Sequence, residues 1–303
     1  MTGVQRHAAG LAVLLAWGMG LPSGMVLAQS AGTADDALAR GAYLSRAAGC
    51  MSCHTESVEG AQPFAGGRAL ETPFGTFYSP NITPDPETGI GEWSDADFIT
   101  ALRTGTAPEG HLYYPVFPYP SYTKMREDDM LAIKDYLFSL VPVRAANKDH
   151  EAQFPLGWRF LLNGWTMMNF TEGELADDPT QSAEWNRGRY LVDAMSHCGE
   201  CHTPRGIFGG TDSSMYLAGT ADGPEGELVP NITPHETGIA DWSEADIAYL
   251  LKSGSKPSFD NVQGSMAEAI EDGLSHLNDA DLKAIAVYLK SIPAIENRVE
   301  KPE

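Results

Sequence analysis

The sequence predicts a mainly α-helical protein made of two tandem domains of one kind, joined by a connector. Its 303 residues suffice for two domains of about 100–150 residues each. The pentapeptide C-x-x-C-H occurs at residues 50–54 and again at residues 198–202, and the phrases around it repeat as well, which indicates a duplicated unit. The predicted boundaries are residues 1–28 for a removable leader, 35–142 for the first unit, 143–183 for the connector and 184–295 for the second unit.

Residues 1–28 have the features of a cleaved secretion signal. A polar start containing Arg6 precedes an uncharged apolar run at residues 8–21, and residues 26–28 supply the cleavage site. An uncleaved membrane anchor is the alternative, but glycine and proline interrupt the run before about 18 apolar residues accumulate. We therefore expect cleavage after Ala28 and a soluble, periplasmic mature protein.

The composition excludes some partners. The chain is 43% hydrophobic, as folded proteins usually are, and its 41 acidic against 20 basic residues give a formal net charge of -21. Nucleic acid is disfavoured as a partner because phosphate binding needs clustered lysine and arginine. The excess of acid keeps the protein dispersed and would attract basic partner surfaces.

Each C-x-x-C-H motif has the spacing of a c-type haem attachment site. Two thiols three positions apart face one side of a helical turn, where they can add to the two vinyl groups of one porphyrin. A zinc site would need four ligands in one cluster, whereas these clusters lie 148 residues apart. A disulfide or a C-x-x-C redox pair leaves the adjacent histidine unexplained. We predict two haem c groups attached through Cys50, Cys53, Cys198 and Cys201, with His54 and His202 as proximal iron ligands.

The flanking phrases predict the elements of each unit. An amphipathic helix carrying R-G-x-Y-L, at residues 40–44 and 187–191, should run into each motif. A long loop rich in glycine and proline should follow, containing P-N-I-T-P at residues 80–84 and 230–234. We expect the asparagine of this phrase to organise the loop through bonds from its side chain to the backbone.

Three polar residues mark the starts of later helices. Ser94 and Ser243 each have an aspartate three residues on, Asp97 and Asp246, in a capping-box pattern. Asn278 should begin the last helix in a similar way.

The connector is unusually apolar. We expect its large side chains to pack across the interface between the units; a docking patch for a redox partner is the alternative. These side chains belong to Trp158, Phe160, Trp165, Met167, Met168 and Phe170.

With these motifs assembled, the chain resembles the class I cytochrome c fold, in which the first and last helices cross with a glycine against an aromatic residue. Gly41 with Tyr136, and Gly188 with Tyr288, fit that crossing. The chain is also similar to the cytochrome c subunits of bacterial membrane-bound alcohol and gluconate dehydrogenases, over nearly all of residues 35–295. Those subunits usually carry three haem domains and a C-terminal anchor. The sequence here has two such units and no anchor segment, so the resemblance does not imply membrane attachment.

In the second unit, Met266 is the expected distal iron ligand. Methionine is usual in this class because a thioether raises the reduction potential. Met266 stands in G-S-M-A-E at residues 264–268, which matches a phrase of the resembled family. Its rivals, Met195 and Met215, more naturally fill gaps in the core.

In the first unit, the corresponding position is Phe117, which cannot ligate iron, where the resembled subunits have methionine. Met125, just ahead of the last helix, is the predicted distal ligand of this unit. His111, Met130 and a vacant site are the alternatives. A vacant site would allow peroxide or another small molecule to reach the iron.

Together these features favour an electron carrier of the respiratory chain over an enzyme. Electrons would come from a periplasmic dehydrogenase and pass to a terminal oxidase or another cytochrome. No Ser-His-Asp set, P-loop or dinucleotide fingerprint is recognisable. The alternative is a dihaem enzyme, a peroxidase or an oxidase of a small sulfur compound, with one open or unusually ligated haem. A subunit that works only inside a stable dehydrogenase complex would use the same carrier chemistry.

Overall fold

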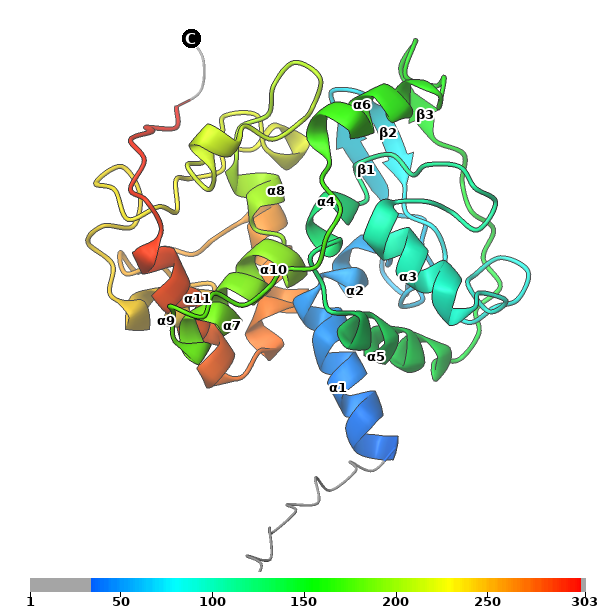
Figure 1. Cartoon of the computed structure of the whole chain (residues 1–303), viewed down its shortest axis with the longest axis horizontal. Helices are drawn as coiled ribbons and strands as arrows, with labels where there is room; N and C mark the ends of the chain where they lie inside the picture. Colours follow the sequence, from blue (N-terminus) through cyan, green and yellow to red (C-terminus); the bar gives the residue numbers. More distant parts are fainter. Residues whose placement is uncertain (1–33, 301–303) are drawn as a thin grey trace, which may run out of the picture. The chain divides into compact units, whose positions relative to one another are not determined.

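Helices dominate the part of the chain that the computed structural model describes, residues 34–300 (Figure 1). The predicted leader lies outside these residues. The first unit contains α1 (Ala34–Ala47), α2 (Cys50–Cys53), β1 (Ala69–Thr72), β2 (Gly75–Tyr78), α3 (Asp95–Thr104), α4 (Tyr119–Tyr122) and α5 (Glu127–Phe138). The connector contributes β3 (Glu151–Ala152) and α6 (Leu161–Asn169). The second unit contains α7 (Ala183–Tyr190), the π-helix η1 (Leu191–Met195), α8 (Gly199–His202), the 3-10 turns η2 (Ser213–Met215) and η3 (Pro224–Gly226), α9 (Glu244–Ser253), α10 (Gly264–Asp272), η4 (Leu274–His276) and α11 (Asp279–Ser291).

Two helix pairs organise the core. Helix α1 packs against α5, and α7 packs against α11. A Cβ atom at Gly41 would overlap the carbonyl oxygen of Ala132 and lie 2.8 Å from the Cβ of Tyr136. A Cβ atom at Gly188 would overlap the corresponding carbonyl in α11 and lie 2.9 Å from the Cβ of Tyr288. The expected crossing of a glycine against an aromatic residue is therefore confirmed in both units.

The expected helix starts are also confirmed. Ser94 caps α3 and Ser243 caps α9, each in a reciprocal capping box with the aspartate three residues later. The Asn278 side chain accepts the backbone N–H of Asp281 at 2.9 Å at the start of α11. Such caps satisfy backbone donors that have no partner inside the helix.

The loop after the first motif differs from the expectation. It contains the antiparallel hairpin β1–β2, which pairs Ala69 with Tyr78 and Thr72 with Gly75. β3, from the connector, extends this sheet beside β2. Gly75 has a φ of 123°, and a Cβ atom there would overlap the carbonyl oxygen of Glu151. Two of the strands have only four residues and the third has two, so the sequence pattern of this sheet is too short to identify.

The asparagine of each P-N-I-T-P phrase bonds its loop to the segment that follows the last helix of the unit. Asn81 Oδ1 accepts the N–H of the threonine two residues later at 2.9 Å, and its Nδ2 donates to the carbonyl of Val143 at 2.7 Å. Asn231 does the same at 2.8 Å, with the carbonyl of Ile295 as its acceptor at 2.8 Å. The expected bonds from side chain to backbone are confirmed.

The connector does not pack across the units in the way the sequence suggested. Trp165 and Phe170 do contact Tyr119 of the first unit, and the indole N–H of Trp165 donates to the carbonyl of Phe208 in the second unit at 2.8 Å. The other apolar side chains are exposed. Only one face of the short helix α6, and of the segment that precedes it, packs against other residues. The expectation is wrong for Trp158, Phe160, Met167 and Met168, of which Met167 is the most open at 87% exposed.

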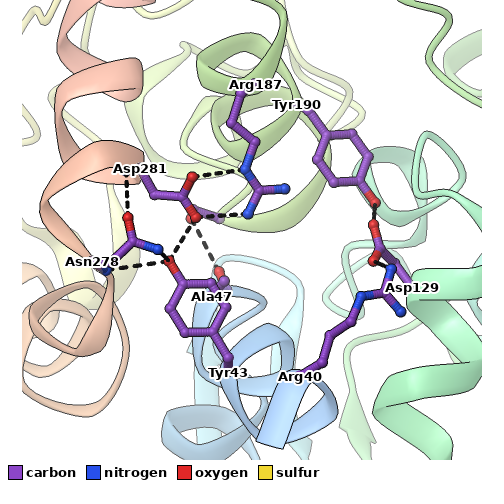
Figure 2. Close-up of polar contacts among 9 residues, drawn as sticks. Arg40, Tyr43, Ala47, Asp129, Arg187, Tyr190, Asn278 and Asp281 are labelled. Atoms are coloured by element: carbon purple, nitrogen blue, oxygen red, sulfur yellow. Dashed lines mark hydrogen bonds and ion pairs between the residues drawn. The ribbon is translucent and has the colours of Figure 1, made fainter. Parts of the chain in front are cut away.

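The units meet through a polar network that the repeated R-G-x-Y-L phrase builds (Figure 2). In the second unit, Arg187 pairs with Asp281 through two bonds of 2.7 and 2.8 Å. Tyr43, which belongs to the first unit, donates its hydroxyl to the same carboxylate at 2.6 Å and accepts from the Asn278 side chain at 3.0 Å. The arginine of the phrase therefore binds within its own unit, and the tyrosine reaches across.

The same arrangement occurs in reverse on the other side (Figure 2). Arg40 pairs with Asp129 at the start of α5, and Tyr190 donates its hydroxyl to that carboxylate at 2.6 Å. The Tyr190 hydroxyl also accepts the backbone N–H of Arg126 at 3.1 Å. Tyr43 with Asp281, and Tyr190 with Asp129, thus form two reciprocal tyrosine–aspartate pairs, as an interface with local two-fold symmetry requires.

Candidate haem-binding sites

The four cysteines lie in pairs on single helical turns. Helix α2 begins at Cys50 and ends at Cys53. Cys198 immediately precedes α8, and Cys201 lies within α8. No disulfide joins these four cysteines. Burial raises the pKa of the Cys50 and Cys198 thiols to about 12. A reactive C-x-x-C redox pair needs a lowered pKa instead, so this environment disfavours thiol redox chemistry.

The histidine of each motif is held by a backbone carbonyl of the following loop. His54 Nδ1 lies 2.8 Å from the carbonyl oxygen of Pro80, and His202 Nδ1 lies 2.9 Å from that of Pro230. Such a bond places the proton on Nδ1 and leaves Nε2 with a free lone pair. Burial lowers the pKa of both imidazoles, which favours the neutral form that can bind a metal. Both histidines therefore fit the role of a proximal iron ligand.

A large, mainly apolar cavity opens beside the second motif and reaches the first, because Cys53 and Arg68 also line it. It has a volume of about 1800 Å³, and Cys198, Cys201, His202 and Met266 all contribute to its wall. Pockets for small ligands commonly have about 300–1,000 Å³, so a porphyrin has room here. Met195 and Met215 are not among the lining residues. Much of the remaining wall is apolar: Ile232, Ile239, Trp242, Leu251, Ile285 and Leu289.

The candidate ligands of the first unit differ in position. Met125 is fully buried in the core, and its backbone carbonyl accepts from Arg103 at 2.9 Å. Met130 is equally buried, inside α5. The His111 side chain is half-exposed, with Nδ1 3.9 Å from a carboxylate oxygen of Glu109. Met125 therefore stays the predicted distal ligand of the first unit. His111 lies outside the core.

One residue at the boundary of the sites was missed by the sequence reasoning. Arg68 donates to the carbonyl of Ser52 at 3.0 Å and pairs with Glu268 at 2.5 Å. Its guanidinium thus joins the turn that carries Cys53 to the helix that carries Met266. The ion pair spans 200 positions of sequence, and no local pattern around Arg68 could have identified it.

The crossed helices and the two C-x-x-C-H motifs with oriented histidines are features of a c-type cytochrome. Residues 38–140 match the family model described as Cytochrome c. The chain belongs to the cytochrome c family. Within residues 34–300, no helix combines the length and the apolarity needed to cross a membrane.

The relatives place the chain more closely. It is 45% identical over 266 residues to a diheme cytochrome c-type protein of Cereibacter sphaeroides, covering 85% of this chain and 86% of the relative. It is 42% identical over 260 residues to the fructose dehydrogenase cytochrome subunit of Gluconobacter japonicus. It is 40% identical over 293 residues to the cytochrome c subunit of a quinone alcohol dehydrogenase of Gluconobacter oxydans.

These two alignments cover 85% and 93% of this chain but only 53% and 60% of the subunits. The chain therefore spans little more than half the length of those dehydrogenase subunits. The resemblance to cytochrome subunits of bacterial dehydrogenases is confirmed.

Proposed function

We propose that the chain is an exported electron carrier with two tandem cytochrome c domains, at residues 35–142 and 184–295, each holding one haem c. The observation that carries this proposal is the repeated histidine geometry: in both motifs Nδ1 meets the carbonyl of the proline in P-N-I-T-P. When bound, haem supplies a reversible one-electron change at iron. The proposed attachment and ligand residues are Cys50, Cys53, His54 and Met125 for the first haem, and Cys198, Cys201, His202 and Met266 for the second.

The chain's own groups would hold and tune each site. The hydrogen bond from Nδ1–H to a backbone carbonyl fixes the plane of the imidazole. It also makes Nε2 a stronger ligand for iron. The apolar side chains around the second motif exclude water and so influence the potential. Met266 lies in the wall of the same cavity, which supports it as the proposed distal ligand.

A periplasmic dehydrogenase is the proposed donor, and a terminal oxidase or another cytochrome is the proposed acceptor. The support is that similar proteins are named as cytochrome subunits of fructose, gluconate and alcohol dehydrogenases. Export is inferred from the leader at residues 1–28. A net charge of -21 favours docking with basic surfaces. No relative found carries the name of a peroxidase or a sulfur-compound oxidase, so the enzyme alternative gains no support.

The test is a mass measurement with an absorption spectrum of the purified mature protein. We expect a mass gain of two haem groups that survives denaturation, because thioether bonds are covalent. The oxidised protein should show the long-wavelength absorption band of a thioether–iron bond, with an intensity for two methionine ligands. Absence of covalent haem would refute the proposal. A high-spin iron in one site would favour the enzyme alternative.

A further inference from the structure

The two units differ by one residue just ahead of the haem-attachment motif. Between the leucine of R-G-x-Y-L and the first cysteine, the first unit has five residues (45–49) and the second has six (192–197). Helix α1 runs without interruption to Ala47. In the second unit, α7 passes instead into the π-helix η1 at Leu191–Met195. A π-helical turn accommodates an extra residue, and such turns are frequent at functional sites.

This π-helical turn presents Asp193 to the interior. The residue is only 9% exposed, and its Oδ1 accepts the hydroxyl of Tyr216 at 2.5 Å. The hydroxyl of Tyr288 donates to Oδ2 at 3.0 Å. Arg189 Nε lies 3.7 Å from the same Oδ2. Two hydroxyl donors directed at one carboxylate stabilise its negative charge.

The carboxylate of Asp193 lies close to the second haem-attachment motif. The backbone N–H of Cys198 donates to the carbonyl of Val192 at 3.1 Å, which joins the motif to the π-helical turn. The ring of Tyr216 lies against Gly199, where an added Cβ atom would be 2.5 Å from the ring. Tyr216, whose hydroxyl bonds to Asp193, therefore links this carboxylate to the motif.

The first unit has no such charge in the matching segment. Residues 45–49 contain no aspartate or glutamate. A guanidinium bonds to the backbone of each motif: Arg68 donates to the carbonyl of Ser52, and Arg205 donates to the carbonyl of Glu200. Each of these arginines is paired with a glutamate, Glu268 or Glu200, so the buried carboxylate of Asp193 is the charge that the segment ahead of the first motif lacks.

We propose that Asp193 lowers the reduction potential of the second haem site relative to the first and so directs electrons from the second unit to the first. The proposal rests on the proposed function. A negative charge stabilises oxidised iron over reduced iron, and a protein interior screens that attraction less than water does. One electron leaves the second site, which is oxidised, and reduces the first; no bond or proton changes place. The dehydrogenase would then donate to the second unit, and the acceptor would take electrons from the first.

The test is a potentiometric titration of the protein carrying both haems, followed by absorption. The native protein should give two midpoint potentials. Met266→His identifies the second site, because loss of the thioether lowers that midpoint. Asp193→Asn should raise the lower midpoint and leave the higher one in place. Asp193→Glu, which keeps the charge, should restore a midpoint close to the native value.

Asp281→Asn is the matched control. Asp281 is also a buried carboxylate of the second unit with tyrosine and arginine partners, and it makes no contact with the motif among the bonds described. Its substitution should leave both midpoints unchanged. An equal shift in both aspartate variants, or no shift in Asp193→Asn, would overturn the proposal.

Arg189→Gln provides an independent readout if Asp193→Asn does not fold. Removing the positive charge beside Asp193 should lower the second midpoint further, the opposite sign to that expected for Asp193→Asn. An unchanged midpoint in Arg189→Gln would also contradict the proposal. Failure of the proposed function itself is distinguishable, because the native protein would then lack covalent haem altogether.

Discussion

The reciprocal tyrosine–aspartate pairs should hold the two units together, and removing one hydroxyl from each tests this role. In Tyr190→Phe, the carboxylate of Asp129, 3% exposed, loses a donor at 2.6 Å but keeps Arg40. A hydrogen bond to a charged group contributes about 1.5–3 kcal/mol. Because Asp129 keeps one partner, we expect a loss of about 1.5 kcal/mol in the free energy of unfolding.

Tyr43→Phe removes the corresponding hydroxyl from Asp281, whose pairing with Arg187 remains. Tyr43 is only partly buried, so the expected loss is smaller, about 1 kcal/mol. The two pairs share no residue, and the double variant should therefore lose about 2.5 kcal/mol, close to the sum.

The assay is urea unfolding of the protein with both haems attached. The midpoint should fall while the slope with urea stays the same, as expected when native-state contacts alone change. Tyr249→Phe is the control: its ring is 61% exposed and its hydroxyl makes no bond described in residues 34–300. It should change the unfolding free energy by less than about 0.5 kcal/mol. A double variant as stable as Tyr249→Phe would refute the argument that these pairs hold the units together.

Three further outcomes follow from the structure. Burial, and then the bond to Asp281, raises the pKa of Tyr43 from 10.0 to about 12; its contribution to stability should be complete below pH 10 and lost as the pH rises towards 12. Urea unfolding measured across this pH range should show a smaller loss of stability in Tyr43→Phe than in the native protein. An equal loss would contradict the assignment. Met125→Ala and Met266→Ala should each remove half of the thioether–iron band, whereas a full band in either variant would exclude that residue as a ligand. Gly188→Ala should lower the free energy of unfolding by about 1–3 kcal/mol, because the added methyl overlaps a carbonyl of α11; unchanged thermal unfolding would show that the crossing can adjust.

The local features could be predicted from the sequence because the interactions that form them span only a few residues. The capping boxes at Ser94 and Ser243 close over three positions. The side chains of Asn81 and Asn231 each accept the backbone N–H of the threonine two residues later. A motif of five residues places both thiols and the imidazole on one helical turn. The helix crossings at Gly41 and Gly188 were predicted from the resemblance to the class I cytochrome c fold.

Tertiary structure decided what depends on distant segments. The bond between Tyr43 and Asp281 spans 238 positions, and neither residue is remarkable within its own helix. The exposure of Met167 and the strand that β3 adds to the hairpin depend on which neighbours are available, not on hydrophobicity. Asp193 is buried in the π-helical turn, where the hydroxyl of Tyr288 donates to its carboxylate. The sequence alone thus determined the two C-x-x-C-H motifs and the helices that carry them. The charges and contacts around the motifs form only when the chain folds and brings remote side chains together.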